Sequence, residues 1–256
     1  RIMANEVEKF NTIAIADIEK INTIASANME NLNTLEFLAI VPVVATFTAN
    51  PSEGYTGGAS EKTQFTFSNV AIGSATDDRA VIVTIGVAAG TASGVTFGAM
   101  TIGGVTATKH GSTADGFTGA PGMAVYSASV PSGTTATIVI NFPVKNHTPG
   151  LSVYSTVGPI SLHEAVKLDS DTSGSAALSF APDVPAGGFV VEHTYDFATS
   201  TYTTSEVTEH YDRVIVSNRG DTAGSKHYDD AASPTITVDP SGSGATGGIV
   251  AVFAPG

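Results

Sequence analysis

The chain contains no cysteine among its 256 residues, which excludes disulfides, thiolate catalysis and cysteine-ligated zinc sites. Tryptophan is also absent, and charged residues make up only 14% of the sequence, against about 25% in an average soluble protein. No apolar run reaches the roughly 18 residues that a membrane-spanning helix needs. Because no basic region followed by an apolar core stands at the start, we expect no secretory signal.

Basic residues are scarce as well. The 11 Lys and Arg residues stand against 24 Asp and Glu residues, which gives a net charge of −13 and an isoelectric point near 4.6. Nucleic-acid binding needs basic stripes that neutralise phosphates, and anionic membrane surfaces attract the same kind of stripe. We therefore expect neither nucleic acid nor a membrane as a partner.

What the chain does contain changes abruptly at residue 42. Residues 4–41 are rich in Glu, Asn, Ile and Ala and hold no Gly or Pro, whereas Gly, Ser, Thr and Val dominate from Pro42 onward. A composition change of this kind marks a boundary between two structural parts. The sequence predicts a helical repeat segment over residues 1–41 and a β domain over residues 42–256.

The second part alternates apolar and polar residues as β-strands do. Turn signals such as PSGTT, PAGG and NRGD separate the alternating stretches, and no helical periodicity intervenes. This pattern predicts a mainly β fold, an antiparallel β-sandwich or jelly roll. The last strand is apolar throughout and should be central in its sheet. The predicted strands are residues 44–49, 63–70, 79–88, 101–108, 123–130, 135–142, 151–156, 160–166, 189–195, 203–210, 214–218, 235–239 and 248–253.

The first part repeats itself at an 11-residue interval. The segments FNTIAIADIEK, INTIASANMEN and LNTLEF follow one another from Phe10, and six of the 11 positions are identical between the first two. One interpretation is a continuous helix, because 11 residues make three turns and keep an apolar stripe on one face. The other is a set of short helices that turn at Asn-Thr and stack as a small solenoid, which explains the recurring Asn-Thr better.

Both interpretations leave apolar side chains that about 35 residues cannot bury alone. The segment then needs copies of itself, a partner, or its own β domain to cover them. Packing on its own β domain is the plainest alternative. We expect an oligomerisation or attachment interface made of these apolar residues: Phe10, Ile13, Ile18, Ile21, Ile24, Met29, Leu32 and Leu35.

The motif FNTIAIADIEKINTIA resembles repeats at the N-termini of virion structural proteins of tailed phages, especially marine and cyanobacterial ones. Those repeats often turn at Asn-Gly, whereas this chain has Asn-Thr. The stretches VTFGAMTIGGVTATKHGS, GMAVYSASVPSGTTATIVINF and GGIVAVFAPG resemble the β-sandwich domains of phage fibres and decoration proteins.

The resemblance implies a protein of the virion surface, either a capsid decoration protein or a short head or tail fibre. Its N-terminal segment would form a homotrimer and attach to other virion proteins of the capsid or tail, and the sandwich would be displayed outward. The resemblance supplies no catalytic residues and no cofactor. No GxSxG elbow is present in the sequence either, and we do not expect an enzyme.

Two groups of side chains could nevertheless form a binding site. Tyrosine suits stacking against sugar rings, so a host glycan is a possible ligand of four tyrosines, unless their rings only cover the sheet: Tyr195, Tyr202, Tyr211 and Tyr228. His193, His210 and Asp230 could converge on a metal. Their spacing matches no ligand pattern, so solvated strand ends are favoured and no metal is expected.

Overall fold

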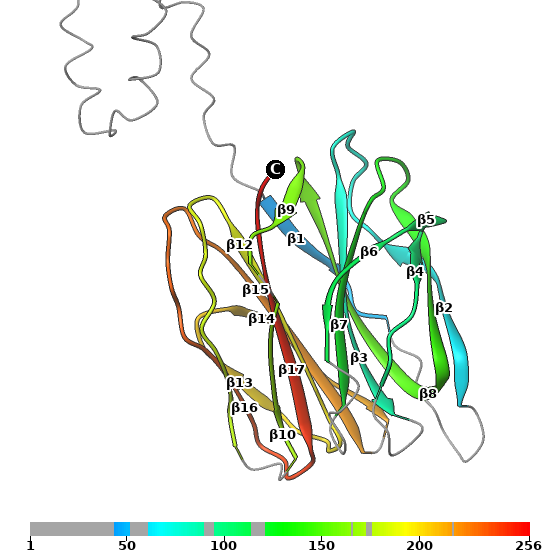
Figure 1. Ribbon diagram of the computed structural model, residues 1–256, viewed down its shortest axis with the longest axis vertical. Helices are drawn as coiled ribbons and strands as arrows, with labels where there is room; N and C mark the ends of the chain where they lie inside the picture. Colours follow the sequence, from blue (N-terminus) through cyan, green and yellow to red (C-terminus); the bar gives the residue numbers. More distant parts are fainter. Residues whose placement is uncertain are drawn as a thin grey trace, which may run out of the picture. The chain divides into compact units, whose positions relative to one another are not determined.

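The computed structural model describes residues 44–51, 61–89, 95–113, 121–164, 166–172, 176–216 and 218–256. The 11-residue repeat and its eight predicted interface residues, Phe10, Ile13, Ile18, Ile21, Ile24, Met29, Leu32 and Leu35, lie outside the described residues. The described part is built from seventeen β-strands in antiparallel sheets and holds no helix (Figure 1). The prediction of a mainly β, antiparallel domain is therefore confirmed. No helix in this described part is long and apolar enough to cross a bilayer.

The first sheet, called sheet A, has eight strands, ordered β5-β4-β8-β3-β7-β6, with β1 and β2 also paired to β8. Its longest strand, β8, runs for 23 residues. The first half of β8 pairs with β2 and β4, and the second half pairs with β3 and β1. The strands are β1 (Val44–Ala49), β2 (Lys62–Ala71), β3 (Ala80–Ala89), β4 (Met100–Ile102), β5 (Val105–Thr106), β6 (Thr108–Ser112), β7 (Gly122–Ser129) and β8 (Thr135–Val157).

Two further sheets follow in the chain. Sheet B is ordered β10-β17-β12-β15-β14, with β9 paired to β17, and sheet C is ordered β11-β16-β13. Sheet B consists of β9 (Ile160–Leu162), β10 (Lys167–Asp171), β12 (Phe189–Asp196), β14 (Thr208–Val216), β15 (Arg219–His227) and β17 (Thr246–Pro255). Sheet C consists of β11 (Leu178–Phe180), β13 (Tyr202–Thr204) and β16 (Ile236–Pro240).

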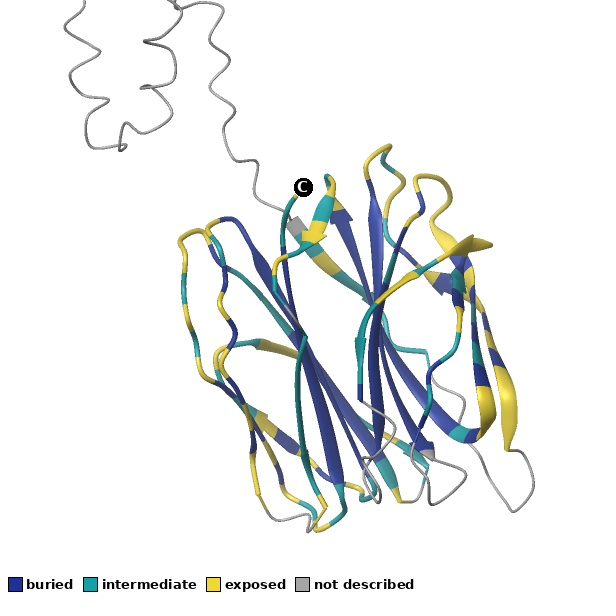
Figure 2. Ribbon diagram, viewed as in Figure 1, coloured by how far each residue is buried: buried dark blue, intermediate teal, exposed yellow. Residues whose placement is uncertain are grey.

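Three hydrophobic cores lie between these layers, and most of the long strands are buried along their length (Figure 2). The first core is enclosed within sheet A, where Phe65 of β2 and Val83 of β3 belong to one cluster. The second core joins sheets A and B, and the third joins sheets B and C. Successive residues of a strand point to opposite faces, so Val191 of β12 enters the second core and Val190 enters the third.

The layering differs from the single sandwich expected from the sequence, and several strands are regrouped. The strands predicted at 135–142 and 151–156 are one continuous strand, β8. The strand predicted at 101–108 is interrupted at Gly103 and Gly104, whose φ values of 60° and 82° turn the chain between β4 and β5. The prediction for the last strand is confirmed, because β17 lies between β10 and β12.

The sequence patterns also missed three strands and misplaced two others. β10, β11 and β15 were not predicted, and the strands predicted at 203–210 and 214–218 are redistributed into β13 and β14. β15 is the important omission. It is paired on both sides, with β12 and with β14, and it carries the residue at the centre of the site described next.

Candidate functional site

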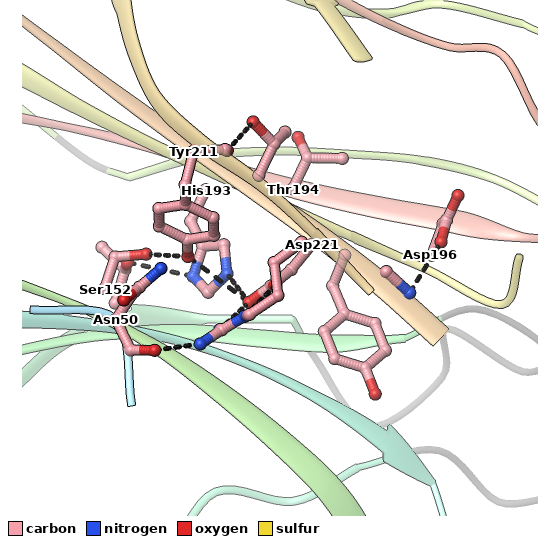
Figure 3. A network of polar contacts seen from close by, with 12 residues as sticks. Asn50, Ser152, His193, Thr194, Asp196, Tyr211 and Asp221 are labelled. Atoms are coloured by element: carbon pink, nitrogen blue, oxygen red, sulfur yellow. Dashed lines mark hydrogen bonds and ion pairs between the residues drawn. The ribbon is translucent and has the colours of Figure 1, made fainter. Parts of the chain in front are cut away.

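Polar side chains gather between the facing surfaces of sheets A and B, beside the second core (Figure 3). Sheet A contributes residues of β3 and β8, and sheet B contributes residues of β12, β14 and β15. We call this group the polar network; its members are Thr84, Ser152, His193, Tyr211, Arg213 and Asp221.

Asp221 of β15 is the centre of the polar network and is completely buried. Its Oδ2 accepts hydrogen bonds from His193 Nε2 and from the Tyr211 hydroxyl, each at 3.3 Å. Arg213 forms a bidentate ion pair with the carboxylate: Nε lies 2.9 Å from Oδ1, and Nη2 lies 2.5 Å from Oδ2. Burial alone would raise the pKa of Asp221, but the hydrogen bonds from His193 and Arg213 and the charge of Arg213 outweigh it and lower the pKa. Asp221 is therefore an ionised carboxylate inside the domain.

Three contacts extend the polar network from sheet B to sheet A and to the residue that follows β1. His193 Nδ1 lies 3.0 Å from the Thr84 hydroxyl on β3, and the Tyr211 hydroxyl lies 2.6 Å from the Ser152 hydroxyl on β8. Arg213 Nη1 donates to the carbonyl oxygen of Asn50, just after β1. An ionised carboxylate can only accept hydrogen bonds. Nε2 of His193 therefore carries a hydrogen and donates the hydrogen bond to Asp221. The polar network thus links β12, β14 and β15 to three separate segments.

Two glycines of sheet A allow this close approach. A Cβ atom added at Gly150 of β8 would overlap the Asp221 carboxylate and would lie 3.0 Å from Arg213 Nη2. A Cβ atom at Gly86 of β3 would lie 2.7 Å from the Tyr195 ring. The absence of side chains at these two positions makes room for the bulky polar groups of sheet B.

The connectivity of Thr84, His193 and Asp221 is that of a hydroxyl–imidazole–carboxylate triad. All three side chains have zero exposure to solvent, however. A nucleophile needs a reachable substrate atom about 3 Å away, and zero exposure leaves no approach for one. What this arrangement does is hold the two sheets together in one register.

A second buried carboxyl group lies on the opposite face of β12. Glu192 has zero exposure, and its Oε1 accepts a hydrogen bond of 2.6 Å from the Thr194 hydroxyl. Within the part of the chain that the structure describes, its Oε2 has no hydrogen-bond partner. Burial raises the pKa of Glu192 to about 8, assisted by the charges of Glu209 and Asp212 and opposed by hydrogen bonds from Thr194 and a backbone amide. Glu192 is therefore mostly protonated at neutral pH.

The four tyrosines predicted as a glycan-binding face do not share a surface. Tyr195 is completely buried in the second core, and its hydroxyl donates to the carbonyl oxygen of Thr148 at 2.7 Å. Tyr202 and Tyr228 are 6% and 9% exposed and belong to the third core. Tyr211 belongs to the polar network. Three of the rings are buried in the cores and Tyr211 is half-buried, which favours the alternative that the sequence had left open, that the rings cover the sheets.

The three residues considered for a metal also lie apart. His193 is part of the polar network, whereas the His210 ring stacks on Phe47 at 4.5 Å with an interplanar angle of 6°. Nε2 of His210 is 2.8 Å from the Ser225 hydroxyl, and Asp230 is exposed. Within the described ranges, no three His, Asp or Glu residues lie together in a way that could hold a metal ion.

Sequence patterns did not identify Thr84, Arg213, Asp221 or Glu192. Asp221 stood inside the stretch NRGD, which signalled a turn. One signal was present: polar residues interrupt two apolar strands, as in AVIVTIGVAA around Thr84 and FVVEHTYD around Glu192. A polar residue inside a buried strand needs a partner, so such interruptions indicate an internal network.

No protein-family model matches the chain, and comparisons with curated proteins and with solved structures found no match. Inference about the function therefore depends on the chain's own residues. The most informative are the N-terminal repeat and the arrangement of the sheets.

Proposed function

We propose that the protein is a structural component of a tailed-phage virion, a capsid decoration protein or a short head or tail fibre. The N-terminal repeat forms a homotrimer and attaches it to other virion proteins, and the β domain is displayed at the virion surface. The observation that carries this proposal is the 11-residue repeat with its recurring apolar residues, together with its resemblance to the repeats of phage virion proteins.

The edges of the sheets support the proposal that the repeat, and not the β domain, carries self-association. Sheet A ends at β5, which has two residues, and at β6, whose pairing is irregular between Lys109 and Gly111. Its other edge strands, β1 and β2, pair only with β8 among the described strands, and the pairing of each is irregular. Sheet B ends at β10, which has five residues, and at β14, whose pairing is irregular at two places. Short or bulged edge strands hinder edge-to-edge association between sheets. Self-association is therefore assigned to the repeat and not to the sheets.

The energy available from the repeat is sufficient for this role. Burial of apolar surface contributes about 25 cal/mol per Å², and a buried Ile or Leu side chain contributes about 1.5–3 kcal/mol. Ile13, Ile24 and Leu35 recur in phase. Covering them in each of three chains can hold a trimer without covalent links.

The test is the solution mass of the full chain and of a truncated chain that begins at Val43, measured by light scattering. The truncation keeps β1, which begins at Val44. We expect a trimer for the full chain and a monomer for the truncated one. Two monomers would refute self-association through the repeat, and two trimers would assign the interface to the β domain.

A triple substitution tests directly whether the repeat forms the trimer interface. Replacing Ile13, Ile24 and Leu35 together by serine in the full chain should also give a monomer, because it removes the recurring apolar positions. The matched control is Val214→Ser, which changes a β-domain valine that is 55% exposed. The control should stay trimeric with the full chain, and loss of the trimer in the control would contradict the proposal.

A further inference from the structure

A pocket of about 330 Å³ opens in the β domain close to β9, away from the polar network. Residues from four places line it: the turn before β3, strands β5 and β6, strand β7, and the segment that enters β9. Its volume is at the lower end of the range of about 300–1,000 Å³ found for small-molecule sites. The lining divides into an acidic wall, a hydroxyl wall and an apolar edge.

The acidic wall is formed by Asp77 and Asp78, which are both exposed and have no ion-pair partner among the described residues. The next residue, Arg79, is 1% exposed and holds their turn in place. Its guanidinium donates to the carbonyl oxygens of Val130 at 2.7 Å and Ser132 at 2.8 Å, and also to those of the preceding loop. The backbone of the turn that carries the two aspartates is therefore fixed in place, and the guanidinium beside them already donates four hydrogen bonds to carbonyl groups.

The hydroxyl wall consists of four side chains on neighbouring strands: Thr106, Thr108, Ser127 and Ser129. Thr108 of β6 is directly paired with Ser127 of β7. The Ser127 hydroxyl lies 2.7 Å from Nε2 of His110, whose ring packs edge-on against Phe253 at 5.4 Å. His110 orients this hydroxyl from behind, so both walls have a supporting residue beneath them, which is the arrangement of a preorganised site.

The chemistry of the two walls selects the ligand. Hydroxyl groups both donate and accept hydrogen bonds, and carboxylates accept them, which matches the hydroxyl groups of a sugar. Pro159 and Ile160 give the pocket an apolar edge for the C–H face of a ring. An anionic ligand would meet two exposed carboxylates, whereas the cation of the described lining, Arg79, is 1% exposed and already donates four hydrogen bonds to carbonyl oxygens. A cationic ligand would use the carboxylates but leave the hydroxyl donors unpaired.

We propose that this pocket binds a neutral saccharide, as a single ring or the end of a chain, through the acidic wall and the hydroxyl wall. The site differs from the tyrosines considered from the sequence, whose rings are interior. The inference goes beyond the structural role proposed above and does not depend on the oligomeric state. A domain displayed outward with such a pocket would also contact carbohydrate at a cell surface.

The test is binding of the full chain to an array of immobilised neutral, sialylated and sulfated saccharides, with polylysine as a cationic probe. We expect binding to at least one neutral saccharide, unchanged between about 50 mM and about 500 mM salt because no charge pair carries it. Asp77→Ala/Asp78→Ala and, separately, Ser127→Ala should each weaken this binding about 10-fold or more, as loss of hydrogen bonds worth about 1.4 kcal/mol would.

The matched control is Asp229→Ala/Asp230→Ala, which removes another exposed pair of adjacent aspartates outside the pocket. It should bind as the unchanged protein does. Melting temperatures of all variants check that they are folded, and the pocket aspartates are exposed enough to be removed without opening a core. The proposal is overturned if no neutral saccharide binds, if only charged probes bind, or if the pocket variants bind as well as the control.

Discussion

Replacing Glu192 by glutamine should make the stability of the protein less dependent on pH. The Glu192 carboxyl is completely buried, one of its oxygens has no hydrogen-bond partner among the described residues, and burial raises its pKa from 4.5 to about 8. Between these two pH values the folded protein holds a proton that the unfolded chain releases. Stability contributed by this proton is present at low pH and is lost as the pH rises toward 8.

The size of the effect follows from the pKa shift. Each pH unit between the two pKa values lowers the free energy of unfolding by about 1.4 kcal/mol. From pH 5 to pH 7 the unchanged protein should therefore lose about 3 kcal/mol through Glu192 alone. Glutamine has the same shape, accepts the Thr194 hydroxyl through its carbonyl oxygen, and does not ionise. Its extra amide donor can add a constant penalty, but it cannot add a pH-dependent one.

The assay is urea unfolding of the unchanged protein and Glu192→Gln at pH 5, 6, 7 and 8. The difference in free energy of unfolding between the two should shift by about 3 kcal/mol in favour of the variant between pH 5 and pH 7. The control is Glu61→Gln, which changes an exposed glutamate and should run parallel to the unchanged protein. A difference that stays constant with pH for Glu192→Gln would refute the reasoning, because Glu192 would then titrate alike in both states.

Four further predictions can be measured by urea unfolding. Asp221→Asn should cost about 3–5 kcal/mol, because the Arg213 guanidinium that faces it, whose side chain is only 17% exposed, loses its counter-charge; a cost below about 1 kcal/mol would mean that the ion pair is hydrated. Gly86→Ala should cost about 1–3 kcal/mol, because the new Cβ would lie 2.7 Å from the Tyr195 ring. Gly104→Ala has nothing within 4 Å and should cost only the strain of its φ of 82°, about 1–2 kcal/mol. Arg79→Met leaves several carbonyl groups without their donor and should cost at least about 2 kcal/mol.

The strands that the sequence predicted well are those with an apolar face of their own. β3 and β17 carry near-continuous Val, Ile and Ala, which identifies a strand buried on both faces. β15, with the sequence RGDTAGSKH, carries no large apolar residue. It is a strand because β12 and β14 pair with its two edges, and strand formation of this kind is decided by context and not by propensity.

β8 shows a different limit of sequence patterns. Pro143 and Pro149 lie between the two strands predicted at 135–142 and 151–156, and proline lacks the N–H group that a central strand needs. The strand continues because the prolines fall where its pairing is interrupted. The β3–β8 register shifts between Gly86 and Ala88, and the facing residues of β8 include Thr148, with a φ of 52°, beside Pro149. An irregular pairing of this kind depends on the partner strand, which the local sequence does not reveal.

The polar network was out of reach of the sequence for a related reason. The Thr84–His193 contact joins residues 109 positions apart, and the carbonyl group of Asn50, which accepts a hydrogen bond from Arg213, is 163 positions from it. Spacing along the chain carries no information about such contacts. The polar interruptions in apolar strands do carry some, because each buried polar group must find a partner. They indicate that a network exists but not which residues meet.

The position of the polar network explains what buried polar groups can contribute to this β domain. A buried ion pair adds little net stability compared with apolar residues of the same volume. The apolar side chains of the second core, such as Val191 and Ile249, could pack acceptably in more than one alignment of sheets A and B. Thr84, Ser152 and the carbonyl oxygen of Asn50 meet His193, Tyr211 and Arg213 in one alignment only, and a slip of sheet A against sheet B would leave these polar groups without their partners at a cost of about 1–3 kcal/mol each. The polar network therefore specifies how the sheets are aligned. The same alignment holds the walls of the pocket together, because β9 pairs with β17 of sheet B, and Pro159 and Ile160 at the start of β9 line the pocket beside β7 of sheet A.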